Sequence, residues 1–409
     1  MDELKKTLIF CFSAVVLAAA AMVVDPGASS PDIFNDQGEL FFPSFTDPQA
    51  PKAIEVIDYD DESATATPLK VEFQDNQWIL PSHNNYPADA ADRLADTAGA
   101  LVELRKDIVI SERVEDHADY GVIDPFDEGA SSLVGRGKRV TLKDGDDNVL
   151  ADFVIGKTVD GKPGHKYLRV PGQRRTYAVE TDVDPSAAFQ DWIETDLLKV
   201  LAADLRRITI NNYAVQEQFG RAMIRPRETF TLNKKDSDWM LGSRKASGTT
   251  MSDLSSALDS LKIVDVQPKP EFLTEDLKGR GTITPSMAAA QSLVQKGFYL
   301  GGTGQIFGNE GEVIVDSKSG IRYTMQFGEI AQSGQKTEAE GEGERRFLLI
   351  AASYSEDREK QYAGEDAELD EKNKELDQEL RERFAGWYYV ISGADFAKLR
   401  PSRSAILGG

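Results

Sequence analysis

The chain has 409 residues, of which 40% are hydrophobic and 28% charged, and its net charge is −22. This composition is typical of a globular protein, and the length allows about two or three domains. The negative charge argues against nucleic acid as a partner, because phosphate binding depends on Lys and Arg side chains. The single cysteine, Cys11, excludes an intramolecular disulfide bond.

An uncharged apolar stretch of 18 residues runs from Thr7 to Val24. As a helix it would be about 27 Å long, which approaches the roughly 30 Å of a bilayer's hydrocarbon core. Lys5 and Lys6 precede it and place the N-terminus in the cytoplasm. Residues 1–24 are therefore predicted to be a transmembrane signal anchor in the cytoplasmic (inner) membrane, with the bulk of the chain periplasmic or otherwise extracytoplasmic. A cleaved signal peptide is the alternative, since the alanine run offers small residues for cleavage.

Residues 25–52 are rich in Pro, Gly, Ser and Asp and have neither a helical nor a strand period. This pattern predicts an extended stalk between the membrane and the globular part. The apolar letters "LFFPSF" within it are expected to pack onto the first domain.

The remainder of the chain reads as two similar halves. "AIEVIDYD" from Ala53 corresponds to "RITINNYA" from Arg207, and each alternates as a strand does. A second strand and a polar turn follow in both halves, and then a tryptophan, Trp78 or Trp239. An amphipathic helix comes next in each, in "ADAADRLADTAGALVEL" and in "TTMSDLSSALDSLKIV". Such correspondence indicates an internal duplication.

The later strands of the two halves also correspond. "RVTLKDGDDNVLADFVIGKT" aligns without a gap with "EVIVDSKSGIRYTMQFGEI", which matches Asp144 with Asp316 and Gly156 with Gly328. The predicted fold class is therefore α+β, with a transmembrane helix followed by two tandem repeats of mainly antiparallel sheet, each with one or two packed helices. The repeats are placed at residues 53–205 and 206–409.

The second half contains a charged, helix-prone insert at residues 355–384. Two interpretations are open. The insert is either a solvated helical arm packed on its own domain or a docking arm for a partner helix. The candidate partner-binding residues form an apolar stripe along one side of it: Leu369, Leu376, Leu380 and Phe384.

The stretch "KDGDDNVLADFVIGKT" imitates two ligand loops. Counted from Asp144 as an EF-hand loop, Val149 stands where a glycine is needed and Ile155 where a glutamate is needed. Ala151 stands at the first glycine of a Walker A loop, and no helix pattern follows Thr158. A strand, turn and strand explain the same letters, and we predict a hairpin here.

No catalytic pattern emerges from the sequence. The three histidines lie in unrelated contexts, and neither a metal-ligand spacing nor a G-x-S-x-G nucleophile motif occurs. The tryptophans are interpreted as core residues rather than as stacking platforms. We therefore predict a non-enzymatic protein with no catalytic residue, no metal and no cofactor, and the sequence identifies no small-molecule ligand.

Several short motifs together resemble the bacterial domain-of-unknown-function 4340 family, mainly over residues 53–210. The motif residues are Tyr120-Gly121-Val122 with Pro125, Ile155-Gly156, Tyr167-Leu168 and Tyr177-Ala178-Val179. The second half lacks a clear counterpart of the first of these motifs. The resemblance implies a membrane-anchored extracytoplasmic protein, often associated with ABC transporter components of the gliding-motility type, and it supplies no catalytic residue.

Three functions follow as hypotheses. The leading one is a membrane-anchored accessory or scaffold protein that binds or braces an ABC-type transporter complex, with its permease and ATPase subunits as partners. The second is an extracytoplasmic carbohydrate-binding or cell-wall-acting enzyme. The third is a purely structural spacer in the cell envelope.

Overall fold

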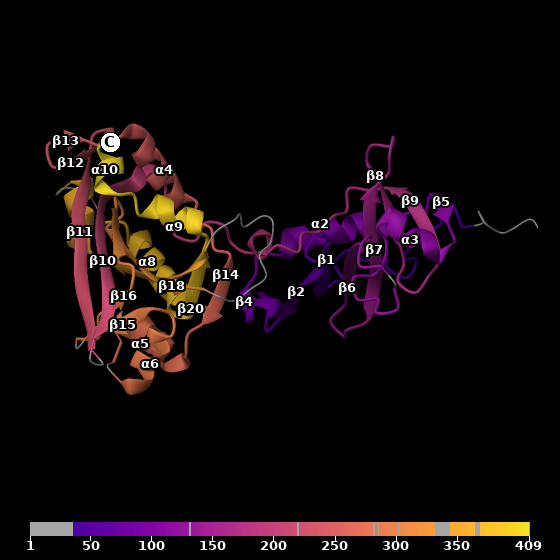
Figure 1. Ribbon diagram of the computed structural model, residues 1–409, viewed down its shortest axis with the longest axis horizontal. Coiled ribbons are helices and arrows are strands. Elements are labelled where there is room, and N and C mark those ends of the chain that lie inside the picture. Colours follow the sequence, from indigo (N-terminus) through magenta and orange to yellow (C-terminus); the bar gives the residue numbers. More distant parts are fainter. Residues whose placement is uncertain are drawn as a thin grey trace, which may run out of the picture.

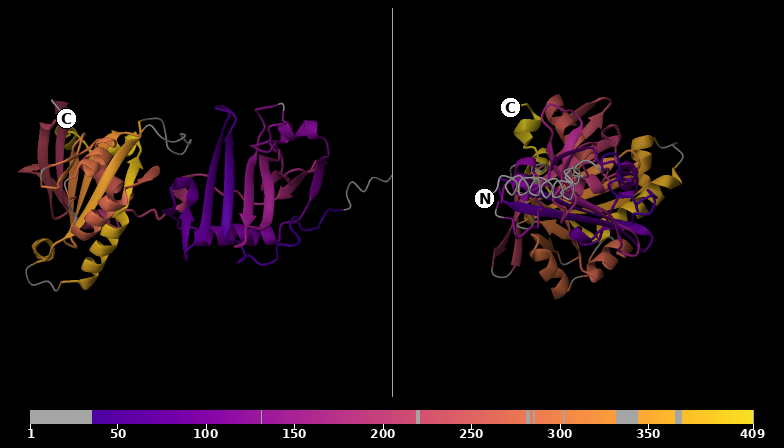
Figure 2. Two further views of the ribbon diagram at one scale, coloured as in Figure 1. Left: turned by 90° about the horizontal axis from the view of Figure 1, so that it is seen from below. Right: turned by 90° about the vertical axis from the view of Figure 1, so that its right-hand side faces the viewer.

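A computed structural model describes residues 36–408 except for 131, 219–220, 281–282, 285, 302, 332–343 and 365–368. Within these residues lie two antiparallel sheets of nine strands each, in two lobes arranged along the long axis of the molecule (Figures 1 and 2). The mixed α+β class with large antiparallel sheets is confirmed.

The first lobe has the strand order β4-β3-β2-β1-β6-β7-β8-β9-β5. Its strands are β1 (Ala53–Asp60), β2 (Thr65–Gln74), β3 (Gln77–Leu80), β4 (Tyr86–Pro87), β5 (Ile108–Ser111), β6 (Lys138–Lys143), β7 (Val149–Thr158), β8 (His165–Arg169) and β9 (Thr176–Glu180). Its helices are α2 (Ala91–Val102) and the short α3 (His117–Tyr120). Leu94, Ala98 and Leu101 recur at three- and four-residue steps and are the buried residues of α2.

The second lobe has the order β13-β12-β11-β10-β17-β18-β19-β20-β14, with β15 and β16 as a separate hairpin. Its strands are β10 (Leu205–Gln218), β11 (Arg221–Lys235), β12 (Asp238–Leu241), β13 (Arg244–Lys245), β14 (Asp265–Pro268), β15 (Phe298–Leu300), β16 (Ile306–Gly308), β17 (Glu312–Ser317), β18 (Ile321–Ile330), β19 (Arg346–Tyr354) and β20 (Trp387–Ile391). Its helices are α4 (Gly248–Asp259), α5 (Glu271–Arg280), α6 (Met287–Val294), α7 (Glu356–Ala363), α8 (Glu371–Ala385), α9 (Gly393–Leu399) and α10 (Arg403–Ile406).

The two strand orders are the same once each strand is replaced by its counterpart in the other lobe. The pairing registers agree as well: Ile54 lies opposite Val71, and Ile208 lies opposite Leu232. β3 pairs with β2 in the same register as β12 pairs with β11. Trp78 on β3 and Trp239 on β12 therefore occupy equivalent positions.

The gap-free alignment of the β6–β7 hairpin with β17–β18 needs one correction. Lys143 lies opposite Ala53 and Asp316 lies opposite Arg207, so Lys143, not Asp144, is the counterpart of Asp316. The cause is a register shift between Leu142 and Lys143, which inserts one residue into the first hairpin. The match of Gly156 with Gly328 is unaffected, because both glycines lie after the turn.

Residues 36–52, the described part of the predicted stalk, do not form an extended stalk. Phe41, Phe42 and Phe45 are buried in the core of the first lobe. The Tyr177 hydroxyl donates a hydrogen bond of 2.6 Å to Asp36. The burial of three aromatic rings accounts for this packing.

The predicted anchor at residues 1–24 lies outside the described residues. None of the helices that the structure describes within residues 36–408 is long and apolar enough to cross a bilayer.

In both lobes the chain has to return from an edge strand to the middle of the sheet. β5 and β14 are edge strands, whereas β6 and β17 lie beside the central strands β1 and β10. The returning chain crosses β7 at Gly156 in the first lobe and β18 at Gly328 in the second. A Cβ atom on Gly156 would lie 2.3 Å from the Tyr120 carbonyl oxygen, and one on Gly328 would lie 2.2 Å from the Lys296 carbonyl oxygen. Only glycine leaves room for such a crossing.

The crossing chain has the same local structure in both lobes. Gly121 and Gly297 both have a left-handed φ, of 69° and 77°, and the residues that follow them, Val122 and Phe298, are fully buried. Lys296-Gly297-Phe298 is therefore the counterpart of Tyr120-Gly121-Val122. The expectation that the second half lacks this motif was wrong, because the glycine and the apolar residue are retained while the tyrosine is not.

The second lobe has an additional hydrophobic core. One large cluster contains residues of both lobes. A second cluster lies on the opposite face of the second sheet, where α5, α6, β15 and β16 cover Leu349 and Tyr388 with Leu273, Leu293 and Phe298.

Lys269 is a buried cation that joins this additional layer to α8. Its Nζ donates hydrogen bonds to the carbonyl oxygens of Phe384 at 2.8 Å and Trp387 at 2.5 Å. Phe384 lies in the last turn of α8, where a cation is favoured and where helix carbonyls lack partners within the helix, and Trp387 is the first residue of β20. Burial lowers the pKa of Lys269 from 10.5 to about 7.

We expect Gly156→Ala and Gly328→Ala each to destabilise the protein by about 3 kcal/mol, because the new methyl group would force two backbone segments apart. Urea unfolding followed by circular dichroism measures the loss. Gly99→Ala in α2 is the matched control, because a Cβ atom there meets nothing within 4 Å; this variant should be slightly stabilised, by about 0.5–1 kcal/mol. If Gly156→Ala unfolded at the same urea concentration as the wild type, the close approach of the two backbone segments at Gly156 would be contradicted.

We expect Lys269 to make stability depend on pH between about 7 and 9. Because its folded-state pKa lies below the unfolded value of 10.5, the unfolded chain binds more protons in this range and stability rises with pH, by at most about 1.4 kcal/mol per pH unit. The free energy of unfolding of the wild type minus that of Lys269→Met should therefore increase from pH 7 to pH 9. A difference independent of pH would show that Lys269 keeps its ordinary pKa.

Candidate functional site

Aromatic side chains join the two lobes. Tyr86 of β4 makes an edge-to-face contact with Trp387 of β20, with ring centroids 5.0 Å apart. Tyr86 also contacts Phe189, at 5.6 Å, and His83 stacks on the same ring at 4.5 Å. The Asn84 side chain donates a hydrogen bond of 3.2 Å to the carbonyl oxygen of Val266 in β14. Figure 1 shows β4 and β14 next to each other at this junction.

His83 of the first lobe and Asp265 of the second lobe are two titratable groups that influence each other at the junction. Burial lowers the pKa of His83, and the charge of Asp265 opposes this shift. Burial raises the pKa of Asp265, while hydrogen bonding and the proximity of His83 oppose this. Desolvation thus disfavours the charged form of both groups.

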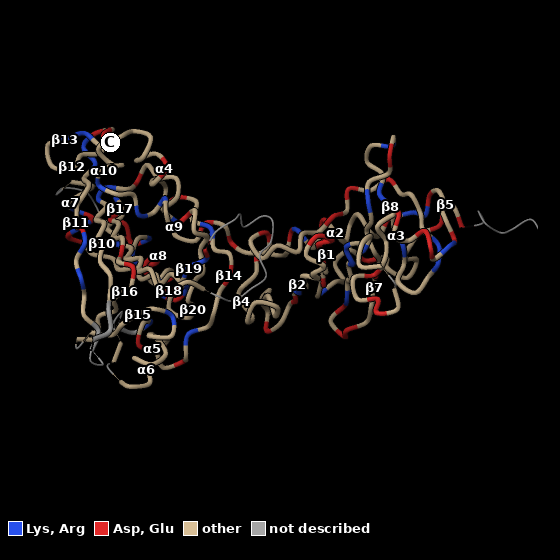
Figure 3. The backbone as a smooth tube through the Cα atoms, viewed as in Figure 1, with Lys and Arg blue, Asp and Glu red and all other residues tan. Residues whose placement is uncertain are grey.

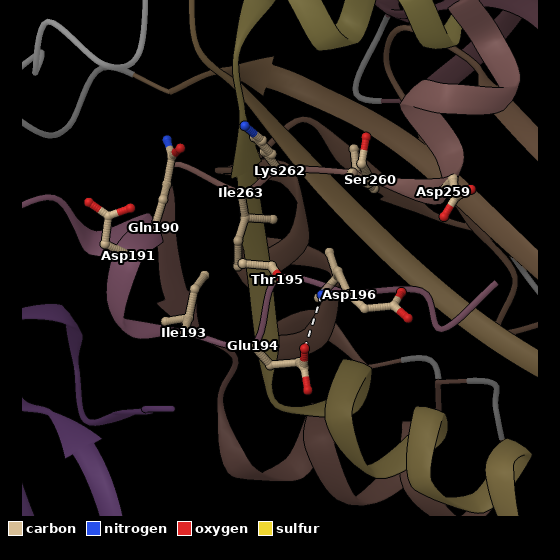
Figure 4. A pocket seen from close by; sticks show the side chains of 12 residues that line it. Gln190, Asp191, Ile193, Glu194, Thr195, Asp196, Asp259, Ser260, Lys262 and Ile263 are labelled. Atoms are coloured by element: carbon tan, nitrogen blue, oxygen red, sulfur yellow. Dashed lines mark hydrogen bonds between the residues drawn. The ribbon is translucent and has the colours of Figure 1, made fainter. Parts of the chain in front are cut away.

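A pocket of about 300 Å³ lies beside the junction (Figure 4). One wall belongs to the linker, which we define as residues 181–204 between β9 and β10. The other wall is the connection from α4 to β14. The lining residues are Gln190, Asp191, Ile193, Glu194, Thr195, Asp196, Leu197, Asp259, Ser260, Leu261, Lys262 and Ile263.

The pocket is acidic, but three of its carboxylates already have backbone partners. Glu194 accepts a hydrogen bond of 3.1 Å from the Asp196 amide, as Figure 4 shows. Asp196 accepts one of 2.7 Å from the Lys199 amide, and Asp259 accepts one of 3.0 Å from the Ala202 amide. These carboxylates therefore shape the linker.

The lining of the pocket combines four carboxylates, those of Asp191, Glu194, Asp196 and Asp259, with the ammonium group of Lys262. Among the described residues there is no group of three or more His, Cys, Asp or Glu side chains that could hold a metal ion. Basic and acidic residues are distributed over both lobes (Figure 3).

The structure places the predicted partner-binding stripe mostly inside the fold. Leu380 and Phe384 are 0% and 1% exposed and belong to the large hydrophobic cluster. Leu376 packs against the same cluster, and Leu369, just before α8, is half-buried. The interpretation of Leu380 and Phe384 as residues free to bind a partner helix has to be corrected, because their side chains already cover the second sheet.

The polar side of α8 contains contacts that the sequence does not indicate. Arg383 donates hydrogen bonds to the carbonyl oxygens of Asp196, at 2.9 Å, and Leu197, at 3.1 Å. Glu379 forms an ion pair of 2.6 Å with Lys199. The spacing of Glu379 and Arg383 predicts contact within the helix. It does not indicate that both reach a linker nearly two hundred residues earlier.

Residues 78–278 match the family described as "Domain of unknown function (DUF4340)". The match begins at Trp78 in β3 and ends in α5, so it includes the crossing at Gly156, the linker and the pocket. It starts and ends later in the chain than the expected range of 53–210. No curated protein and no solved structure matches the chain. The match confirms the resemblance drawn from the sequence motifs: the chain contains a DUF4340 domain.

Proposed function

We propose that the protein is a non-enzymatic accessory or scaffold protein, anchored in the cytoplasmic membrane, whose extracytoplasmic lobes bind and brace an ABC-type transporter complex. The observation that carries the scaffold role is the junction. Aromatic contacts and the linker contacts of α8 connect two lobes of the same strand order, which favours presentation of two surfaces by one molecule.

The outer faces of the two sheets differ in charge at equivalent positions. In the first lobe one row across the strands contains Lys70, Glu55, Thr141 and Asp152. Glu55 pairs with Lys143 at 3.0 Å. Lys70 pairs with Glu72 at 2.5 Å and Asp152 with Arg139 at 2.8 Å, so the charges of this row are paired with neighbouring residues.

The equivalent row in the second lobe contains no charged residue. Its members are Thr231, Thr209, Ile314, Thr324 and Ala351, all of them half-buried. Two lobes with the same backbone and different surfaces are suited to two different partners, because charged rows discriminate between partners by charge and uncharged rows do not.

The support for a transporter partner and for a membrane anchor comes from the sequence. Residues 1–24 have the pattern of a signal anchor, and the resemblance to the family implies association with ABC transporter components. The carbohydrate-binding alternative has less support, because Trp192 and Trp239 are only 2% and 8% exposed and Trp387 is engaged at the junction. Stacking on a sugar requires an exposed ring face.

Purification of the full chain from detergent-solubilised membranes of its own host should recover the permease and ATPase subunits of a transporter. Mass spectrometry of the purified material identifies them. Recovery of the chain without either subunit would overturn the transporter link.

Matched charge exchanges test the idea of two separate surfaces. Thr209→Glu with Thr231→Lys gives the second lobe the pair found at the equivalent positions of the first, and Glu55→Thr with Lys70→Thr does the reverse. Each double variant should fold, because the other lobe accommodates the same pair, and each should lose different subunits in the purification. Loss of the same subunits by both variants, or of none, would contradict separate surfaces.

A further inference from the structure

Helix α8 holds the linker between the lobes. Arg383 reaches two successive linker carbonyl oxygens, those of Asp196 and Leu197. Glu379, one turn earlier in the helix, pairs with Lys199 at 2.6 Å and with Arg383 at 3.4 Å. We call Glu379 and Arg383 the linker clamp.

The clamp is built on a well-anchored helix. The apolar side of α8 is buried through Leu380 and Phe384. The Tyr389 hydroxyl donates a hydrogen bond of 3.0 Å to the Arg383 carbonyl oxygen, and Lys269 binds the carbonyl oxygen of Phe384. The end of α8 that carries the clamp is thus fixed to the second lobe from two sides.

The linker is held in a conformation that a free chain disfavours. Lys199 has a left-handed φ of 50°, which is uncommon for a residue with a side chain. Its amide is bonded to Asp196 and its ammonium to Glu379. Such a backbone conformation persists only where surrounding contacts impose it.

The clamp also has no counterpart in the first lobe. There the strands equivalent to β19 and β20 are β8 and β9, and a short turn with a hydrogen bond from Gln173 to Val170 connects them. The insert with α7 and α8 is therefore an addition to the shared fold, and it lies against the segment that joins the lobes.

We propose that the linker clamp is a releasable device that sets the angle between the two lobes. In the clamped state the linker carbonyls bind Arg383 and Lys199 keeps its left-handed backbone. In the released state the linker relaxes, the junction contacts of Tyr86 with Trp387 and of Asn84 with Val266 break, and the lobes change their relative orientation, while both sheets stay folded. The ion pair suits reversible release, because the Glu379 and Lys199 side chains are 50% and 31% exposed and water can replace either partner. The Arg383 side chain is 19% exposed, so its hydrogen bonds to the linker carbonyls are the stronger part of the clamp.

Limited trypsin digestion of the full chain in detergent tests this device, because Lys199 is itself a cleavage site. Arg383→Gln should raise the rate of cleavage after Lys199 by at least about tenfold, because tenfold is the effect of losing one hydrogen bond from a charged group and Arg383 makes two to the linker. Mass spectrometry identifies the site. Arg381→Gln is the matched control, because Arg381 lies on the same helix and pairs with Asp377 instead of the linker; its cleavage rate should be that of the wild type.

A distance measurement separates release from unfolding. Spin labels at Asp146→Cys and Ser243→Cys, in a chain with Cys11→Ser, report the separation of the lobes. We expect one narrow distance distribution in the otherwise unchanged chain and a broader one after Arg383→Gln, with an unchanged circular dichroism spectrum in both. Equal distributions in the two chains, or equal cleavage of Arg383→Gln and Arg381→Gln, would overturn the proposal. Neither measurement requires a transporter, so failure of the proposed function leaves this test intact.

Discussion

The central constraint on this fold is the passage of one backbone segment directly over another. In each lobe the fifth strand in chain order, β5 or β14, lies at an edge of the sheet. The strand of that sheet that follows it in the chain, β6 or β17, lies at the centre. The chain can make this return only by crossing a face, and the closest approach falls on a strand residue that has no side chain. Gly156 and Gly328 are therefore fixed by topology, and the order of all later strands depends on these crossings.

The same constraint explains a stretch of this sequence that looks like a ligand loop. The glycine before Lys157 and Thr158 imitates the end of a phosphate-binding loop, yet its role is to admit the Tyr120 carbonyl oxygen. The motif around Gly121 and the motif around Gly156 are two sides of one contact, although 35 positions separate them in the chain. A sequence pattern that combines two distant glycines can thus describe packing and no chemistry.

Much of the architecture could be predicted from the sequence, because strand alternation, helix periodicity and turn residues are local signals. The equivalence of Trp78 with Trp239 follows from such signals. The crossing motif of the second lobe was missed because Lys296 replaces the tyrosine, and the glycine with its apolar neighbour was too short a pattern to find alone. The clamp was missed for another reason: which carbonyl oxygen Arg383 reaches depends on the relative placement of two distant segments, and no local pattern encodes that.

The packing of residues 36–52 on the first lobe limits how far that lobe can lie from a membrane. If the anchor ends at residue 24, only residues 25–35 connect it to Asp36, whose carboxylate binds Tyr177. Eleven residues span at most about 35–40 Å even when fully extended. The first lobe would then work close to the lipid surface, and any component farther out would have to be met by the second lobe, whose reach depends on the angle at the linker.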